Sequence, residues 1–162
     1  MQFKRRREGK TDYQKRLRLL KSGKARLVVR RSLRYITAQI TKFGKQGEKT
    51  MVSTTSKELK KLGWEFAGDN LPAAYLTGLL IGKKSLDKKI NEAVLDSGLY
   101  ASVKGSRIYA VVKGANDAGL DIPSDEEILP SEERIKGEHI VGEKFKSLPS
   151  EFEKIKGKII GG

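Results

Sequence analysis

The sequence predicts a mixed α/β domain with a basic N-terminal arm and a C-terminal extension. Three strand-like segments joined by short turns follow one another between residues 26 and 55. Helical spacing of apolar residues then replaces this alternation, interrupted by one more strand-like segment. Positive charge is concentrated before residue 35. We therefore expect an arm over 1–24, a globular α/β domain over 25–123 and an extension over 124–162.

The arm contains a predicted basic helix. Thr11 and Gln14 have the spacing of a capping box, which predicts a helix over 11–22 that ends at Gly23. Its apolar positions form one narrow stripe, Tyr13, Leu17 and Leu20. Lys and Arg occupy the remaining faces of this helix. The preceding residues, 4–10, are expected to be flexible.

Three consecutive strands are predicted after the arm. Residues 26–32 are rich in Val, residues 35–41 alternate between apolar and polar side chains, and residues 50–55 are again β-prone. Residues 43–47 contain two glycines and read as a turn. Short connections of this kind predict an antiparallel meander.

The remaining elements are helices around one further strand. Ser56 is the predicted cap of a short helix that stops at Gly63, and Asn70 caps a longer helix. Residues 92–97 form the fourth strand, which a helical crossover makes parallel to its neighbour. Ser106 caps a helix whose predicted buried face consists of Ile108, Val111, Val112 and Ala115. This order of elements is that of a ribonuclease-H-like topology, followed by an acidic, partly helical extension.

The residues needed for common enzymatic sites are not arranged in the sequence as such sites require. Two-metal nucleases need carboxylates on neighbouring strand ends, but the first strand offers Arg30 and Arg31, and Asp96 stands alone. Glu48 occupies the position before Lys49 where a phosphate-binding loop needs glycine. The chain has no cysteine, which excludes disulfides and thiolate ligands. His139, the single histidine, is expected at the surface or in helix packing. We predict a non-enzymatic protein without cofactor, metal or small-molecule substrate.

The charge distribution predicts a polyanionic partner. The net charge is +14, and residues 1–34 carry 14 basic and 2 acidic side chains, whereas residues 121–162 have a net charge of −3. Such asymmetry favours nucleic acid or an anionic membrane. The apolar stripe of the arm helix is too narrow for a membrane-surface helix, and the apolar runs are too short to span a bilayer. We expect a nucleic-acid-binding protein in the cytoplasm, with no membrane partner.

Cationic and aromatic side chains in the arm have the chemistry of an RNA contact. Arginine forks suit phosphate oxygens, and Tyr13 suits stacking on an unpaired base. Arg30, Arg31 and Arg34 extend the positive charge into the folded domain. Among the remaining cations of the arm, the predicted contacts include Lys4 and Lys15.

Several long stretches resemble one known family. They are RRREGKTDYQKRLRLLKSGKARLVVRRS at 5–32, STTSKEL at 53–59, NLPAAYLTGLLIG at 70–82, EAVLDSGL at 92–99, GSRIYAVVKGANDAGLDIP at 105–123 and EERIKGEHI at 132–140. In this order they resemble the archaeal and eukaryotic-type members of the large-subunit ribosomal protein eighteen family, which binds 5S ribosomal RNA. The resemblance implies a structural component of the central protuberance of the ribosome.

The resemblance also implies partners and contact residues. Members of the family attach 5S rRNA to the large-subunit (23S-type) rRNA and to a neighbouring 5S-binding ribosomal protein. Carried over to this chain, the implied arm contacts are Arg5, Arg6, Arg7, Lys10, Tyr13, Arg16, Arg18 and Lys21. Gly105, Ser106 and Arg107 fit a helix N-terminus that is offered to a phosphate. The alternative interpretation is a free-standing RNA chaperone or a regulatory RNA-binding module.

Overall fold

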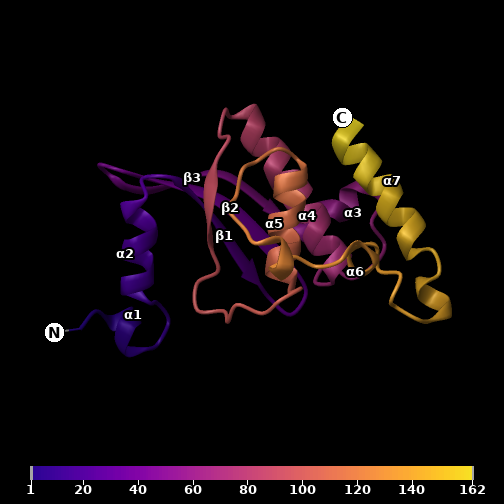
Figure 1. Cartoon of the computed structure of the whole chain (residues 1–162), viewed down its shortest axis with the longest axis horizontal. Coiled ribbons are helices and arrows are strands. Elements are labelled where there is room, and N and C mark those ends of the chain that lie inside the picture. Colours follow the sequence, from indigo (N-terminus) through magenta and orange to yellow (C-terminus); the bar gives the residue numbers. More distant parts are fainter. Residues whose placement is uncertain (1, 162) are drawn as a thin grey trace.

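The computed structural model describes residues 2–161 and contains a four-stranded sheet with helices packed on one face (Figure 1). The strands are β1 (Ala25–Arg31), β2 (Ile36–Gly44), β3 (Gly47–Thr55) and β4 (Ala93–Asp96). Their order in the sheet is β3-β2-β1-β4, with antiparallel β1–β2 and β2–β3 pairs and a parallel β1–β4 pair. The predicted meander and parallel fourth strand are thereby confirmed.

The second and third strands extend further than predicted. Pairing continues through Phe43 opposite Glu48, so the hairpin closes over only two residues, Lys45 and Gln46, and the predicted turn over 43–47 is too long. The register shifts between Ile40 and Thr41, where β3 contributes one extra residue. Backbone pairing needs no burial, which is why exposed polar residues extend these strands beyond the apolar alternation.

Alternation divides the sheet into an apolar and a polar face. The apolar face is fully buried and consists of Leu27, Val29, Ile36, Ala38 and Ile40, together with parts of β3 and β4. On the other face, which we call the open face, β1 places Arg26, Val28 and Arg30, and β2 places Thr37 and Gln39. The open face therefore carries polar and charged groups that the helices packed on the apolar face do not cover.

Helices α3 (Leu59–Leu62), α4 (Leu71–Asp87) and α5 (Arg107–Asp117) follow the predicted order. Asn70 caps α4 as predicted, because its Oδ1 accepts a hydrogen bond of 2.8 Å from the Ala73 amide. The prediction that Ser56 caps the short helix is wrong. Thr55 precedes the first turn instead, and the Ser56 hydroxyl accepts a bond from the Ile36 amide, which ties this turn to β2.

Helix α5 begins after Ser106, as predicted, but the serine does not act as a side-chain cap. Its hydroxyl is buried and has no hydrogen-bond partner within the described chain. The four predicted inward residues of α5 are all buried, Ile108, Val111, Val112 and Ala115. Helix α5 packs directly on α4, and a Cβ at Gly114 would lie 2.1 Å from the Tyr75 carbonyl oxygen.

The arm forms α1 (Lys4–Arg7) and α2 (Tyr13–Lys21), and Figure 1 shows both at the N-terminal end of the molecule. Within the segment 4–10, which was expected to be flexible, residues 4–7 form the helical turn α1. The cap of α2 is Asp12 rather than Thr11, because Asp12 Oδ1 accepts bonds from the Gln14 and Lys15 amides, both at 3.0 Å. A carboxylate at this position also interacts favourably with the helix dipole.

The C-terminal extension contributes to the core. After α6 (Glu132–Lys136), helix α7 (Leu148–Gly161) buries one apolar stripe, Leu148, Phe152, Ile155 and Ile159. The sequence predicted an acidic, partly helical extension here but not this apolar stripe, whose residues alternate with lysines and glutamates. No helix within residues 2–161 is long and apolar enough to cross a membrane.

Candidate nucleic-acid interface

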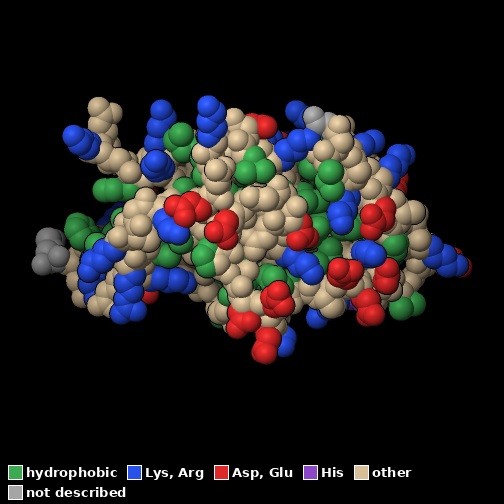
Figure 2. Space-filling model, turned by 45° about the horizontal axis from the view of Figure 1, so that its top comes forward, with side chains coloured by type: hydrophobic (Ala, Val, Ile, Leu, Met, Phe, Trp, Pro, Cys, Tyr) green, Lys and Arg blue, Asp and Glu red, His purple; other side chains and the backbone are tan. Residues whose placement is uncertain are grey.

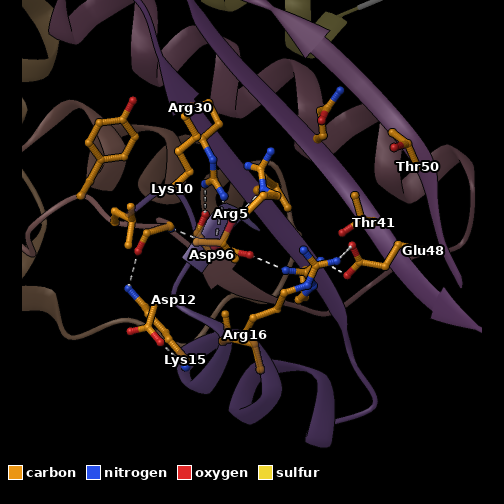
Figure 3. A pocket seen from close by; sticks show the side chains of 18 of the residues that line it. Arg5, Lys10, Asp12, Lys15, Arg16, Arg30, Thr41, Glu48, Thr50 and Asp96 are labelled. Atoms are coloured by element: carbon orange, nitrogen blue, oxygen red, sulfur yellow. Dashed lines mark hydrogen bonds and ion pairs between the residues drawn. The ribbon is translucent and has the colours of Figure 1, made fainter. Parts of the chain in front are cut away.

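The arm lies over the open face and leaves a hollow of about 870 Å³ between them (Figure 3). Helix α2 lines one side, the three long strands line the floor, and the loop after β4 closes an edge. Six basic side chains line the hollow, namely Arg5, Lys10, Lys15, Arg16, Arg26 and Arg30. Five of these were predicted as RNA contacts, and the fold brings four of the arm together with Arg30 of β1.

Arg26 forms the buried floor of the hollow. It is 5% exposed and makes ion pairs with Asp96 and Glu48. A buried guanidinium needs such partners because removing it from water is costly. Arg26 thus joins β1 to β4 on one side and to β3 on the other.

Asp96 also holds Arg30 in place. The Arg30 guanidinium donates to the Asp96 backbone oxygen at 2.8 Å and approaches its carboxylate at 3.4 Å. The Gly98 amide donates to the same carboxylate at 2.8 Å. The carboxylate that stood alone in the sequence is therefore engaged by two arginines and a backbone amide, an arrangement that orients cations.

Two arm cations attach α2 to the sheet. Lys15 Nζ donates to Ser97 Oγ at 3.1 Å and to the Gly98 oxygen at 3.0 Å, and Arg16 forms an ion pair with Glu48 (Figure 3). Ion pairs of partly exposed side chains contribute about 0–1 kcal/mol each. The arm is thus held by a few weak contacts, which a polyanion can replace.

The other arm cations are exposed, and two of them, Arg5 and Lys10, also line the hollow. The four residues of α1 are exposed, and so are Arg18 and Lys21 of α2. Lys10 pairs with Glu8 at 2.9 Å, the one acidic side chain of this turn. Tyr13 is half-buried and its ring centroid lies 5.2 Å from that of Phe3, so these two rings form a small aromatic surface on the arm.

The remaining predicted contacts lie apart from this hollow. Arg31 lies over the Tyr100 ring, 5.0 Å from its centroid, and Arg34 is exposed in the turn before β2. Within the described chain, Gly105, Ser106 and Arg107 do not line the hollow. Arg107 donates to the Asp69 backbone oxygen at 2.7 Å, so this helix start is already tied to the loop before α4.

Sequence reasoning missed the groups that organise the cations, chiefly Arg26, Glu48 and Asp96. Strand alternation places Arg26 and Arg30 on one face opposite Leu27 and Val29, which was an available signal. Their partners come from residues that are distant in the sequence. Such pairings depend on strand order and register, which local patterns do not contain.

The resulting surface suits a polyanion. On the face shown in Figure 2, Lys and Arg side chains gather over the arm, and acidic side chains are concentrated over the middle and the opposite end. Exposed guanidinium groups bind phosphates without requiring deep burial, and the polar open face offers amide and hydroxyl groups beside them. The geometry therefore fits recognition of a nucleic-acid backbone.

Comparisons with known proteins agree with this chemistry. Residues 1–93 match the family model described as "Ribosomal large subunit proteins 60S L5, and 50S L18". The large ribosomal subunit protein uL18 of Korarchaeum cryptofilum is 55% identical over 140 residues, which cover 86% of this chain and 72% of that protein. The uL18 proteins of Methanococcus maripaludis and Methanothermobacter thermautotrophicus are 54% and 50% identical, over 85% and 86% of this chain and 72% of each relative.

This similarity confirms the resemblance seen in the sequence and the expectation of a ribosomal protein rather than an enzyme. The family match alone spans more than half of the chain, and the similarity to the Korarchaeum cryptofilum relative covers 86% of it. The chain belongs to the uL18 family of large ribosomal subunit proteins.

Proposed function

We propose that this chain binds 5S rRNA and attaches it to the large-subunit rRNA and to a neighbouring 5S-binding protein. Membership in the uL18 family supports a structural role in the large subunit. The observation that carries the RNA contact is the row of exposed cations on α1 and α2 beside the polar open face. In this proposal, the residues that the sequence predicted as RNA contacts are the ones that bind the RNA.

Phosphate contacts supply most of the affinity in this proposal. If the arm and the adjoining strands neutralise on the order of six to ten phosphates, affinity falls by about 10³–10⁵ between 50 and 200 mM salt. This contribution does not distinguish one RNA from another. Selectivity for 5S rRNA must come from RNA shape and from unpaired bases that meet Tyr13 and the open face.

The experiment compares binding to 5S rRNA with binding to a transfer RNA at about 150 mM salt. The wild-type chain, the variant R5Q/R6Q/R7Q and the control K144Q/K146Q/K154Q are titrated with both RNAs. The two variants lose the same charge, and the control lysines are exposed in and before α7, at the opposite end of the molecule from the arm (Figure 1).

The wild-type chain is expected to prefer 5S rRNA by at least tenfold. The arm variant should lose most of this affinity, and the slope of log Kd against log salt should fall by about 2–3, because each lost phosphate contact removes about 0.7–0.9. The control should bind like the wild type. Equal binding of both RNAs by the wild type would contradict the proposal and favour the RNA chaperone.

A further inference from the structure

The tip of the β2–β3 hairpin is a basic projection that the predicted site does not include. Residues 42–49 are all exposed, and they contain three lysines, Lys42, Lys45 and Lys49, and one aromatic residue, Phe43. In Figure 1 the tip extends past the helices, on the side of the molecule that also carries the arm. The tip and the arm therefore form two projections from one end of the sheet.

Two of the lysines at the tip lower the stability of the hairpin. Lys42 lies directly opposite Lys49 in the β2–β3 register. Like charges at directly opposite positions destabilise an antiparallel pair. Nothing acidic is paired with either lysine among the ion pairs of the described residues. A polyanion placed against this part of the hairpin would convert the repulsion into attraction.

Phe43 adds an apolar surface to the same tip. It is 60% exposed, although a phenylalanine normally buries most of its ring. Its cross-strand partner is Glu48, and directly opposite residues share a face. Because Glu48 pairs with Arg16 and Arg26, this is the face that looks toward the arm.

Glu48 also determines where the tip stands. Its carboxylate contacts Arg26 in the buried floor and Arg16 on α2, so it links the hairpin to both. The hollow lies between these attachments, and Thr50 and Glu48 of β3 form its border on the hairpin side. The hairpin is therefore oriented beside the arm before any ligand is bound.

We propose that the β2–β3 hairpin tip is a second RNA-binding element, in which Lys42, Lys45 and Lys49 contact phosphates and Phe43 stacks on an unpaired base. This inference rests on the proposed function and adds a contact that is independent of the arm. Lysine ammonium groups bind the phosphates of an RNA backbone, and an exposed aromatic ring can stack on any unpaired base. Because side chains alternate along a strand, Lys42 and Lys49 lie on the opposite face of the hairpin from Phe43. An RNA that stacks on Phe43 therefore contacts these two lysines where its backbone passes around the hairpin tip, and its orientation is fixed by the arm and the tip together.

The test uses the full chain with 5S rRNA. The variant K42Q/K45Q/K49Q is compared with the control K144Q/K146Q/K154Q, which loses the same charge at the other end of the molecule. The hairpin variant is expected to bind at least tenfold more weakly at 150 mM salt, and its log Kd–log salt slope should fall by about 2–3. Its melting temperature should not decrease, because the substitution removes the repulsion between Lys42 and Lys49.

Phe43 is tested separately because stacking does not depend on salt. F43A is expected to weaken binding about 5- to 100-fold, the range for loss of one stacked base, with an unchanged salt slope. F43Y retains an aromatic face and should restore binding. A spectroscopic readout, quenching of 2-aminopurine placed at unpaired positions of the RNA, should decrease in F43A and return in F43Y.

The outcomes separate this inference from the proposed function. Wild-type preference for 5S rRNA together with a hairpin variant that behaves like the control would overturn the hairpin contact and leave the proposed function standing. Equal wild-type binding of both RNAs would contradict the proposed function, whereas a reduced salt slope of the hairpin variant would still support the contact. Weaker binding of F43A that F43Y does not restore would overturn the stacking role.

Discussion

At the scale of single residues, charged side chains work in two different ways in this protein. Those of α1 are exposed and accessible to phosphates, whereas Arg26 and Asp96 are buried and neutralise each other. Buried pairs of this kind add little net stability but enforce one arrangement, because an unpaired charge in the same place would be costly. Here the arrangement positions Arg30 and, through Glu48, the arm.

Glu58 is a second partly buried carboxylate with structural partners. Burial raises the pKa of Glu58, but hydrogen bonds from Lys84 at 2.6 Å and from the Thr55 amide at 3.1 Å outweigh it. With the attraction of the Lys84 charge and a bond from Thr54, they hold the pKa below its ordinary value of 4.5. The ionised form is therefore favoured by folding.

The variant E58Q should be destabilised in a pH-dependent way. Since the folded-state pKa is the lower one, the charge of Glu58 stabilises the fold above about pH 4.5 and loses this effect as the pH falls through the folded pKa. We expect a loss of roughly 0.5–1 kcal/mol at pH 7, because water screens this partly exposed pair, and a smaller loss at pH 3. Urea unfolding at both pH values measures it, with the exposed E126Q as control. A loss that is equal at pH 3 and pH 7 would contradict the assignment to charge.

At the scale of elements, the packing of α4 on α5 depends on glycine. Gly78 of α4 and Gly114 of α5 each face the backbone of the other helix, and a Cβ at Gly78 would lie 2.2 Å from the Val111 oxygen. The two helices approach so closely that no side chain fits between them at these points. Sequence patterns predicted both helices and the buried face of α5 but did not indicate this contact.

Replacement of Gly114 should therefore separate the helices. G114A places its methyl group against the Tyr75 carbonyl, and we expect the free energy of unfolding to fall by about 3 kcal/mol, at the upper end of overpacking effects. The matched control is G157A in α7, where a Cβ meets no atom within 4 Å. This control should gain about 0.5–1 kcal/mol from helix propensity. Chemical denaturation measures both, and similar effects of the two substitutions would contradict the close packing.

At the scale of the whole molecule, one continuous core runs from the sheet to the C-terminal helix. It includes Leu27 of β1, Leu79 of α4 and Phe152 of α7, which packs 5.5 Å from the Tyr75 ring. The arm, by contrast, contributes no buried residue among its described residues, 2–24, and is attached by polar contacts. The sequence-based division at residue 124 remains a prediction about independent folding.

A substitution in α7 tests whether the extension folds together with the sheet. Phe152 is 1% exposed, so F152A should lower the free energy of unfolding by about 3–5 kcal/mol. If the core is cooperative, calorimetry should show a single transition that moves as a whole. A separate early transition, with the main one unchanged, would mean that the extension unfolds on its own.

Local residue patterns were sufficient to predict the order of strands and helices, the parallel fourth strand, the cap at Asn70 and the buried stripe of α5. They also indicated the basic arm and its polyanionic partner, since alternation, helical spacing and charge are properties of neighbouring residues. Where the cations lie was decided by tertiary structure. Arg26 meets Asp96 and Glu48, and the arm meets the loop after β4, only because strands distant in the chain pair in one register. The hollow exists for the same physical reason, because buried charges and backbone pairing act there between residues that local sequence does not connect. The hairpin itself is local, but its tip lies beside the arm through the ion pairs of Glu48 with Arg16 and Arg26.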